Sequence, residues 1–123
     1  MFEPAIKWSG SKRSQAEEII KHFPKEIETY YEPFCGGCSV LRRLLDSDIK
    51  VKNIICSDLN QDLINLWNEI KNNPEQTFKH YEKLWNELNI DEDTTRKRSY
   101  FEMVRERYNK EKNPLDFLFI MRT

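Results

Sequence analysis

Two strand-turn-helix segments follow one another in the first half of the chain, and this order restricts the fold more than any other feature. In the first, strand-forming residues at 28–32 lead through a turn with two glycines at 33–37 into apolar residues at helical spacing. In the second, the apolar run 51–56 ends in Ser57-Asp58 and is followed by another helix-spaced set: Leu63, Ile64, Leu66, Trp67 and Ile70. A helix that links two strands usually makes them parallel neighbours. The sequence therefore predicts an α/β fold with the parallel strand order of a doubly wound sheet.

Composition narrows the class of protein further. Lys and Arg (20) nearly balance Asp and Glu (21), so no overall positive charge attracts nucleic acid, and any such contact needs a local basic patch. No run approaches the roughly 18 apolar residues that cross a bilayer, and the N-terminus lacks the apolar stretch of a signal peptide. We expect a soluble, cytoplasmic protein that binds no membrane. Its three cysteines are then expected to be reduced thiols.

The remaining segments are predicted to be helical. Ser14 and Glu17 have the spacing of a capping box, which predicts a helix over 15–22. Beyond residue 72 the sequence predicts helices that start at Pro74 and near Thr95, with no strand between them. We therefore expect a helical insertion after the second strand-turn-helix segment.

A Cys-x-x-Cys pair, Cys35 and Cys38, encloses the two glycines of the first turn. A redox pair needs a thiol with a lowered pKa, for example at a helix N-terminus, and either cysteine suits that position. A zinc site needs two further ligands, and the chain offers only Cys56, His22 and His80, without paired spacing. We favour a glycine turn and expect no metal, with a thiol or zinc site as the minor alternative.

Acidic residues stand at the ends of both predicted strands. Glu32 ends the first strand and Asp58 follows the second, with Gly36 and Gly37 between them in the chain. The carboxyl ends of neighbouring parallel strands form the crevice in which doubly wound proteins bind nucleotides. Glycine permits close approach of a ligand, and a carboxylate can accept hydrogen bonds from both hydroxyls of a ribose. The pattern indicates a nucleoside-binding crevice, while the alternative for Asp58 is an Asx cap of the following helix.

The helix predicted near Thr95 carries basic residues interleaved with aromatic ones: Arg96, Lys97, Arg98, Tyr100, Phe101, Arg105, Arg107 and Tyr108. A solvated helix face with i,i+4 partners such as Glu102 and Glu106 is the simpler interpretation, and we prefer it on these residues alone. A face that contacts the phosphates of DNA is the functional interpretation.

Three stretches, in this order and spacing, resemble the N-terminal half of one enzyme family: KWSGSK at 7–12, YYEPFCGGCSV at 30–40 and SDLNQDLINLW at 57–67. They are similar to the Dam-type (D12 class) adenine-specific DNA methyltransferases. The resemblance implies a methyl transfer from the cofactor S-adenosyl-L-methionine to N6 of adenine in double-stranded DNA. It also implies part of a Rossmann-like sheet with a helical insertion, in a cytoplasmic protein of bacterial or phage origin.

The resemblance also assigns functional residues. Six residues match the family's cofactor-binding motifs: Trp8, Lys12, Glu32, Phe34, Gly36 and Asp58. Trp8 and Lys12 match the motif that holds the cofactor from the N-terminal side, and Asp58 matches the residue that binds its ribose. The other three match the glycine loop under the methionine part, where Cys38 stands at a position that is often glycine in the family.

The family's layout divides the chain into three parts. They are the N-terminal part of the cofactor-binding domain at 1–67, a helical target-recognition insertion at 68–112, and the start of a further apolar helix, truncated, at 113–123. The candidate DNA contacts in the insertion are Arg96, Arg98 and Arg105.

The family's D-P-P-Y tetrapeptide, which holds the adenine amine, is absent from the sequence. We therefore expect no catalytic residue here and an N-terminal part that is inactive alone and needs a complementing C-terminal subunit. The terminal segment FLFIMRT is then expected to expose apolar surface, because its packing partners would be missing. The alternative function is a non-catalytic module, derived from such an enzyme, that binds DNA or another subunit.

Overall fold

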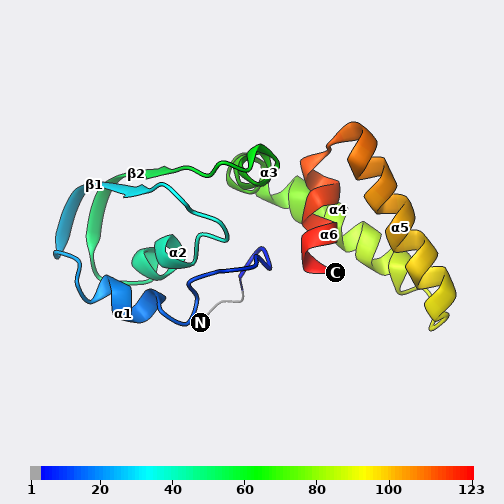
Figure 1. Ribbon diagram of the computed structural model, residues 1–123, viewed down its shortest axis with the longest axis horizontal. Helices are drawn as coiled ribbons and strands as arrows, with labels where there is room; N and C mark the ends of the chain where they lie inside the picture. Colours follow the sequence, from blue (N-terminus) through cyan, green and yellow to red (C-terminus); the bar gives the residue numbers. More distant parts are fainter. Residues whose placement is uncertain (1–3) are drawn as a thin grey trace. The chain divides into compact units, whose positions relative to one another are not determined.

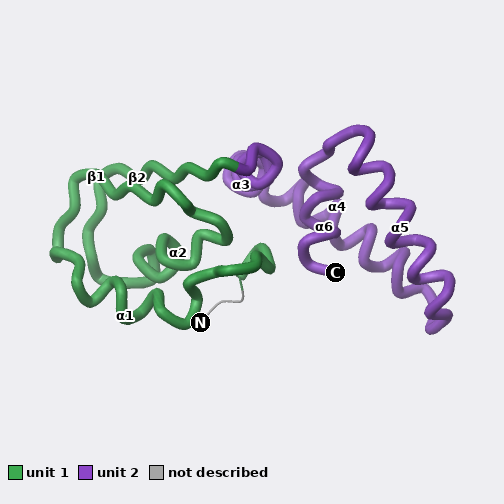
Figure 2. The backbone as a smooth tube through the Cα atoms, in the orientation of Figure 1, with its two compact units in different colours: residues 1–59 green, residues 60–123 purple. Residues whose placement is uncertain are grey.

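The computed structural model describes residues 4–123. The described part of the chain contains two strands and six helices (Figure 1). They belong to two compact units, residues 1–59 and residues 60–123, and each unit has buried apolar residues of its own (Figure 2).

The first unit contains a two-stranded parallel sheet. Strand β1 (Glu26–Glu32) pairs with β2 (Lys50–Cys56) in a register that places Tyr30 opposite Ile54 and Glu32 opposite Cys56. Both strands are rich in β-branched and aromatic residues, which favour extended backbone. The predicted parallel α/β arrangement is confirmed for these two strands, which form the whole sheet within the described residues.

Two short helices accompany the strands. Helix α1 (Ala16–Ile20) precedes β1, and α2 (Ser39–Leu45) connects β1 to β2 and packs against α1. The predicted capping box is wrong, because the N-cap residue is Gln15 and its side chain makes no capping hydrogen bond. The physical reason is an earlier turn: the carbonyl of Lys12 accepts hydrogen bonds from the amides of both Gln15 and Ala16, so Ser14 lies inside that turn.

The core of the first unit is small. Ile6, Ala16 and Leu44 are almost completely buried, and Cys35 and Cys38 are buried beside them. The two thiols therefore belong to the packed interior of the turn after β1, where cysteine behaves as a small apolar residue.

The second unit is a bundle of four helices. They are α3 (Gln61–Asn72), α4 (Pro74–Leu88), α5 (Thr94–Glu111) and α6 (Pro114–Arg122). Proline occupies the first turn of α4 and α6, where its missing amide is tolerated. The side chains of Asn60, Asp93 and Asn113 cap α3, α5 and α6 by accepting hydrogen bonds from backbone amides. The predicted helical stretch after the second strand is confirmed.

The core of the second unit is built around Phe119 of α6. Its ring contacts Tyr81 of α4 together with Tyr100 and Phe101 of α5, and Leu84, Leu88 and Val104 complete the cluster. Phe117, Leu118 and Phe119 are 7%, 0% and 0% exposed, so the expectation of exposed apolar surface at FLFIMRT is wrong. Helices α3, α4 and α5 supply the packing partners for that segment.

A buried ion pair links three helices of the second unit. Asp116, 1% exposed, accepts two hydrogen bonds of 2.7 Å from the guanidinium of Arg107 and lies 2.9 Å from Nε2 of His80. Burial by itself raises the pKa of Asp116, but the bonds from Arg107 and His80 hold that pKa below its usual value. The carboxylate therefore stays ionised inside the bundle.

No helix in the described residues is long and apolar enough to span a lipid bilayer.

Candidate functional site

The ends of β1 and β2 are held together beyond the last strand residues. The amide of Ser57 donates to the carbonyl of Glu32 at 3.0 Å, and the amide of Cys35 donates to the carbonyl of Ser57 at 2.9 Å. The Ser57 hydroxyl also donates to the carbonyl of Pro33. These three hydrogen bonds hold the turn after β1 directly beside Asp58.

Gly36 occupies the centre of that turn. Its amide donates to Oδ2 of Asp58 at 3.0 Å, and its φ of +49° lies in the left-handed region that favours glycine. A Cβ at this position would stand 3.0 Å from Cδ1 of Trp8. The backbone conformation and the packing of the indole ring therefore both favour glycine at this position.

A cavity of about 330 Å³ opens at these strand ends, within the first unit. That volume is at the lower end of the range for small-molecule sites. All six residues predicted to bind the cofactor line it: Trp8, Lys12, Glu32, Phe34, Gly36 and Asp58. They come from three separate stretches of sequence, so the structure brings together what the motifs suggested.

Among the remaining lining residues, Cys35 and Gly37 belong to the glycine turn noted in the sequence, whereas five others were not singled out: Ser9, Gly10, Ser11, Ser39 and Val40. Among them the hydroxyls of Ser11 and Ser39 form a hydrogen bond that joins the segment after Trp8 to the start of α2. Both serines lie within the stretches that carry the family resemblance, which was the available signal. A serine by itself is too common on loops to be selected.

Glu32 is the buried acid of the cavity, with 9% exposure. Its Oε1 accepts hydrogen bonds from the hydroxyl of Tyr30 at 2.8 Å and from the amide of Leu41 in α2 at 3.1 Å. Its Oε2 is buried and has no hydrogen-bond partner. Burial raises the pKa of Glu32, although these two hydrogen bonds act in the opposite direction.

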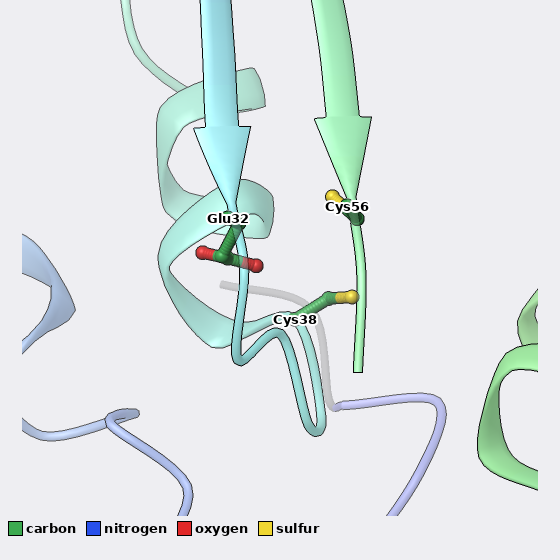
Figure 3. A group of neighbouring side chains, drawn as sticks. All are labelled: Glu32, Cys38 and Cys56. Carbon is green, nitrogen blue, oxygen red and sulfur yellow. The ribbon is translucent and has the colours of Figure 1, made fainter. Parts of the chain in front are cut away.

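The cysteines near the cavity do not have the properties of a redox pair. All three are free, and Cys38 and Cys56 lie near Glu32 (Figure 3). Burial, reinforced by Cys35 and Cys56, raises the pKa of Cys38 far above its usual value, and burial with Glu32 raises the pKa of Cys56 to about 11. Burial raises the pKa of Cys35 as well. A nucleophilic thiol needs the opposite shift.

The three arginines predicted to contact DNA lie on or near the surface of α5, in different settings. The guanidinium of Arg96 donates hydrogen bonds to the carbonyls of Glu87 and Leu88 and to the side chain of Asp91. These bonds hold the turn between α4 and α5 in place. Arg98 is exposed and forms the expected i,i+4 ion pair with Glu102. Arg105 is exposed, with no ion-pair partner among the described residues.

The cavity combines chemically different groups around a small volume. Trp8 and Phe34, the latter 88% exposed, offer aromatic faces, while Glu32 and Asp58 offer carboxylates and Lys12 an ammonium group. Such a set suits a ligand with a flat ring, hydroxyls and charged ends. Fold and site together define an α/β protein with a ligand cavity at the carboxyl ends of parallel strands.

Comparison with known families places the chain within that class. Residues 8–123 match the model of the D12 class N6 adenine-specific DNA methyltransferases. The chain belongs to this family, and the resemblance seen in its three sequence stretches is confirmed.

Individual relatives agree with this assignment. The Type II methyltransferase M.MjaIII of Methanocaldococcus jannaschii is 33% identical over 134 residues, which cover 98% of this chain and 45% of the relative. The DNA adenine methylase of Escherichia coli K12 is 33% identical over 109 residues, covering 89% of this chain and 35% of the relative. That of Vibrio cholerae is 39% identical over 80 residues, covering 65% and 26%. The chain spans less than half the length of these relatives.

Proposed function

We propose that this chain supplies the S-adenosyl-L-methionine site of a methyltransferase that acts on N6 of adenine in double-stranded DNA. The observation that carries the proposal is the convergence of six motif residues, from three stretches, on one cavity. Family membership supports the cofactor and the substrate. DNA as substrate would place the activity in the cytoplasm of a bacterium, an archaeon or a phage-infected cell.

The residues present fit the cofactor. Asp58 holds the glycine turn through Oδ2 and stands where it would accept hydrogen bonds from the ribose hydroxyls. Glu32 brings a buried oxygen without a hydrogen-bond partner, suited to a donor on the methionine part, and Lys12 would balance the carboxylate. Trp8 and Phe34 would contact the adenine ring and the sulfonium. When bound, the cofactor supplies an electrophilic methyl group.

The acceptor side of the reaction calls for other groups. The exocyclic amine of adenine is a weak nucleophile, and the flipped base must be held in line with the methyl group by hydrogen-bond acceptors. The 123 residues contain no Asp-Pro-Pro-Tyr to do this. We propose that they bind the cofactor without transferring its methyl group, and that a segment or subunit carrying the tetrapeptide completes the enzyme.

The same proposal assigns a different role to each part of the chain. Residues 1–67 would belong to a Rossmann-like cofactor domain, and 68–112 would form a target-recognition insertion ahead of the apolar segment 113–123. The exposed guanidinium groups of Arg98 and Arg105 support a DNA contact on α5. Arg96 would contribute mainly by fixing the turn that precedes this helix.

A calorimetric titration of the chain with S-adenosyl-L-methionine tests the proposal. We expect saturable binding, and Asp58→Ala should weaken it by about tenfold or more because a charge-assisted hydrogen bond is worth about 1.5–3 kcal/mol. Asp58→Asn keeps an acceptor for the Gly36 amide and so separates support of the turn from contact with the ligand. Asp48→Ala, an exposed acid on the same unit, is the matched control and should bind normally.

Two results would overturn the cofactor assignment. One is a folded chain that shows no saturable binding, and the other is unchanged affinity in Asp58→Ala. Salt-dependent DNA binding by α5 without any affinity for the cofactor would instead favour the non-catalytic module, for which the exposed arginines are the supporting observation.

A further inference from the structure

Three potential metal ligands meet where the two strands end. Glu32 and Cys56 are register partners on β1 and β2, so their side chains leave the sheet at the same level and on the same face. Cys38 reaches this point from the turn, where it is the N-cap of α2 with φ +55°. The carboxylate oxygen and the two sulfur atoms all lie within 4.8 Å of one another. Figure 3 shows both sulfur atoms on the side toward which one Glu32 oxygen points.

The electrostatics of this group are unbalanced. Oε2 of Glu32 is buried without a hydrogen-bond partner, on a side chain with 9% exposure. A buried carboxylate oxygen without a donor carries the cost of its lost hydration. Among the described residues no Lys, Arg or His forms an ion pair with Glu32. An electropositive partner of a size that fits between the oxygen and the sulfurs would remove this cost.

We propose that Glu32, Cys38 and Cys56 form a binding site for a zinc-class divalent cation. Zinc takes Cys sulfur at about 2.3 Å and carboxylate oxygen at about 2.0–2.2 Å, which separates neighbouring ligands in a tetrahedral site by roughly 3.5–3.8 Å. The observed separations, none of them above 4.8 Å, exceed these values by at most about 1.3 Å, which rotation of the three side chains would have to supply. Binding would displace one proton from each thiol to solvent.

The chemical nature of the three ligands decides which metal ions the site would prefer. Two sulfurs with one carboxylate suit Zn²⁺ or Co²⁺, whereas Mg²⁺ and Ca²⁺ prefer sites made only of oxygen. Three protein ligands leave a fourth tetrahedral position for a water molecule. Cys35 is outside the group, although it belongs to the same Cys-x-x-Cys pair. The site therefore joins one cysteine of that pair to the end of each strand.

A bound cation would join three parts of the first unit: the end of β1, the end of β2 and the start of α2. A ligand that binds only the folded state stabilises it in proportion to the logarithm of its concentration over Kd. Zinc should therefore raise the melting temperature of the first unit. This effect does not depend on methyl transfer. The cation and the cofactor would compete for Oε2 of Glu32, so zinc binding is measured without the cofactor, and its test stays separate from that of the proposed function.

The test is a titration of the reduced chain with Zn²⁺ in competition with a chromophoric chelator, together with Co²⁺ as a spectroscopic probe. We expect one equivalent to bind and Co²⁺ to give sulfur-to-metal charge-transfer absorption. Cys38→Gly removes one ligand at a residue whose positive φ suits glycine, so folding should be kept. This variant and Cys56→Ala should bind at least about tenfold more weakly, while Cys35→Ser, the matched control, should bind normally.

Alkylation provides a second readout. Zinc should protect Cys38 and Cys56 from iodoacetamide, as mapped by mass spectrometry, and should protect Cys35 less. This measurement keeps the proposal testable if Cys56→Ala does not fold. The proposal is overturned if the folded chain takes up no stoichiometric zinc, or if Cys38→Gly binds zinc as tightly as the parent chain.

Discussion

The contact between Gly36 and Trp8 leads to a quantitative prediction about the cavity. Gly36→Ala places a Cβ 3.0 Å from Cδ1 of the indole, a contact tighter than most real Cβ contacts, on a residue with φ +49°. The left-handed conformation costs a non-glycine residue about 1–2 kcal/mol. Displacing the Trp8 ring from its rotamer adds about 0.5–1.5 kcal/mol. The expected loss of unfolding free energy is therefore about 1.5–3.5 kcal/mol.

Gly10→Ala is the matched control. Gly10 also has a positive φ, +76°, but a Cβ there would meet nothing within 4 Å. The control should lose only the backbone part, about 1–2 kcal/mol. The difference between the two variants thus isolates the contact with the indole from the strain of the backbone.

Urea unfolding followed by Trp8 fluorescence measures this difference, in a Trp67→Phe, Trp85→Phe background that leaves one indole in the first unit. A double-mutant cycle with Trp8→Leu should abolish the excess cost of Gly36→Ala; because this cycle removes the indole, its unfolding is followed by circular dichroism. Equal losses in the Gly36 and Gly10 variants would refute the reasoning, as would an excess that persists without the indole.

Four further predictions concern the second unit. Arg107→Leu leaves Asp116 buried with only His80 as partner, so the helical unit should lose about 3 kcal/mol of unfolding free energy. This is less than the maximum for a buried pair, because the Arg107 side chain is 37% exposed. A loss below about 1 kcal/mol, measured by urea unfolding with circular dichroism, would contradict the prediction. Because the folded pKa of Asp116 is lowered, its stabilisation is present above the ordinary aspartate pKa and lost as pH falls through the lowered value, so stability should decline from about pH 4 downward, and less steeply in Asp116→Asn. Asn60→Ala removes the cap of α3 and should cost about 1 kcal/mol, with Asn60→Asp restoring most of it. Replacing both Arg98 and Arg105 by Ala should weaken DNA binding and flatten its salt dependence by about two counterions, and an unchanged slope would remove α5 from the proposed DNA face.

The strands and most helices were predictable because local signals sufficed. Strand-forming residues and an apolar run located the two strands, and prolines at 74 and 114 located the starts of α4 and α6. The capping box at Ser14 failed because a backbone carbonyl, that of Lys12, had already begun the turn. Side-chain patterns do not reveal such backbone competition.

The candidate site was predicted in its members but not in its contacts. The motifs selected six residues that line the cavity, yet they gave no sign that Asp58 holds the Gly36 amide or that Trp8 packs on the glycine. The burial of FLFIMRT was missed for a similar reason: its packing partners come from α3, α4 and α5, far away in sequence. Long-range packing is a property of the folded chain rather than of any one segment.

Arg96 shows how economically the turn between α4 and α5 is specified. Its guanidinium reaches the main-chain carbonyls of Glu87 and Leu88 at 3.1 and 2.6 Å. Every residue has a backbone carbonyl, so a change of side chain at position 87 or 88 leaves both acceptors of Arg96 in place. The contact does not survive the loss of Arg96, since lysine lacks the planar, forked donors. This contact therefore depends on the residue at position 96 and not on which side chains stand at 87 and 88.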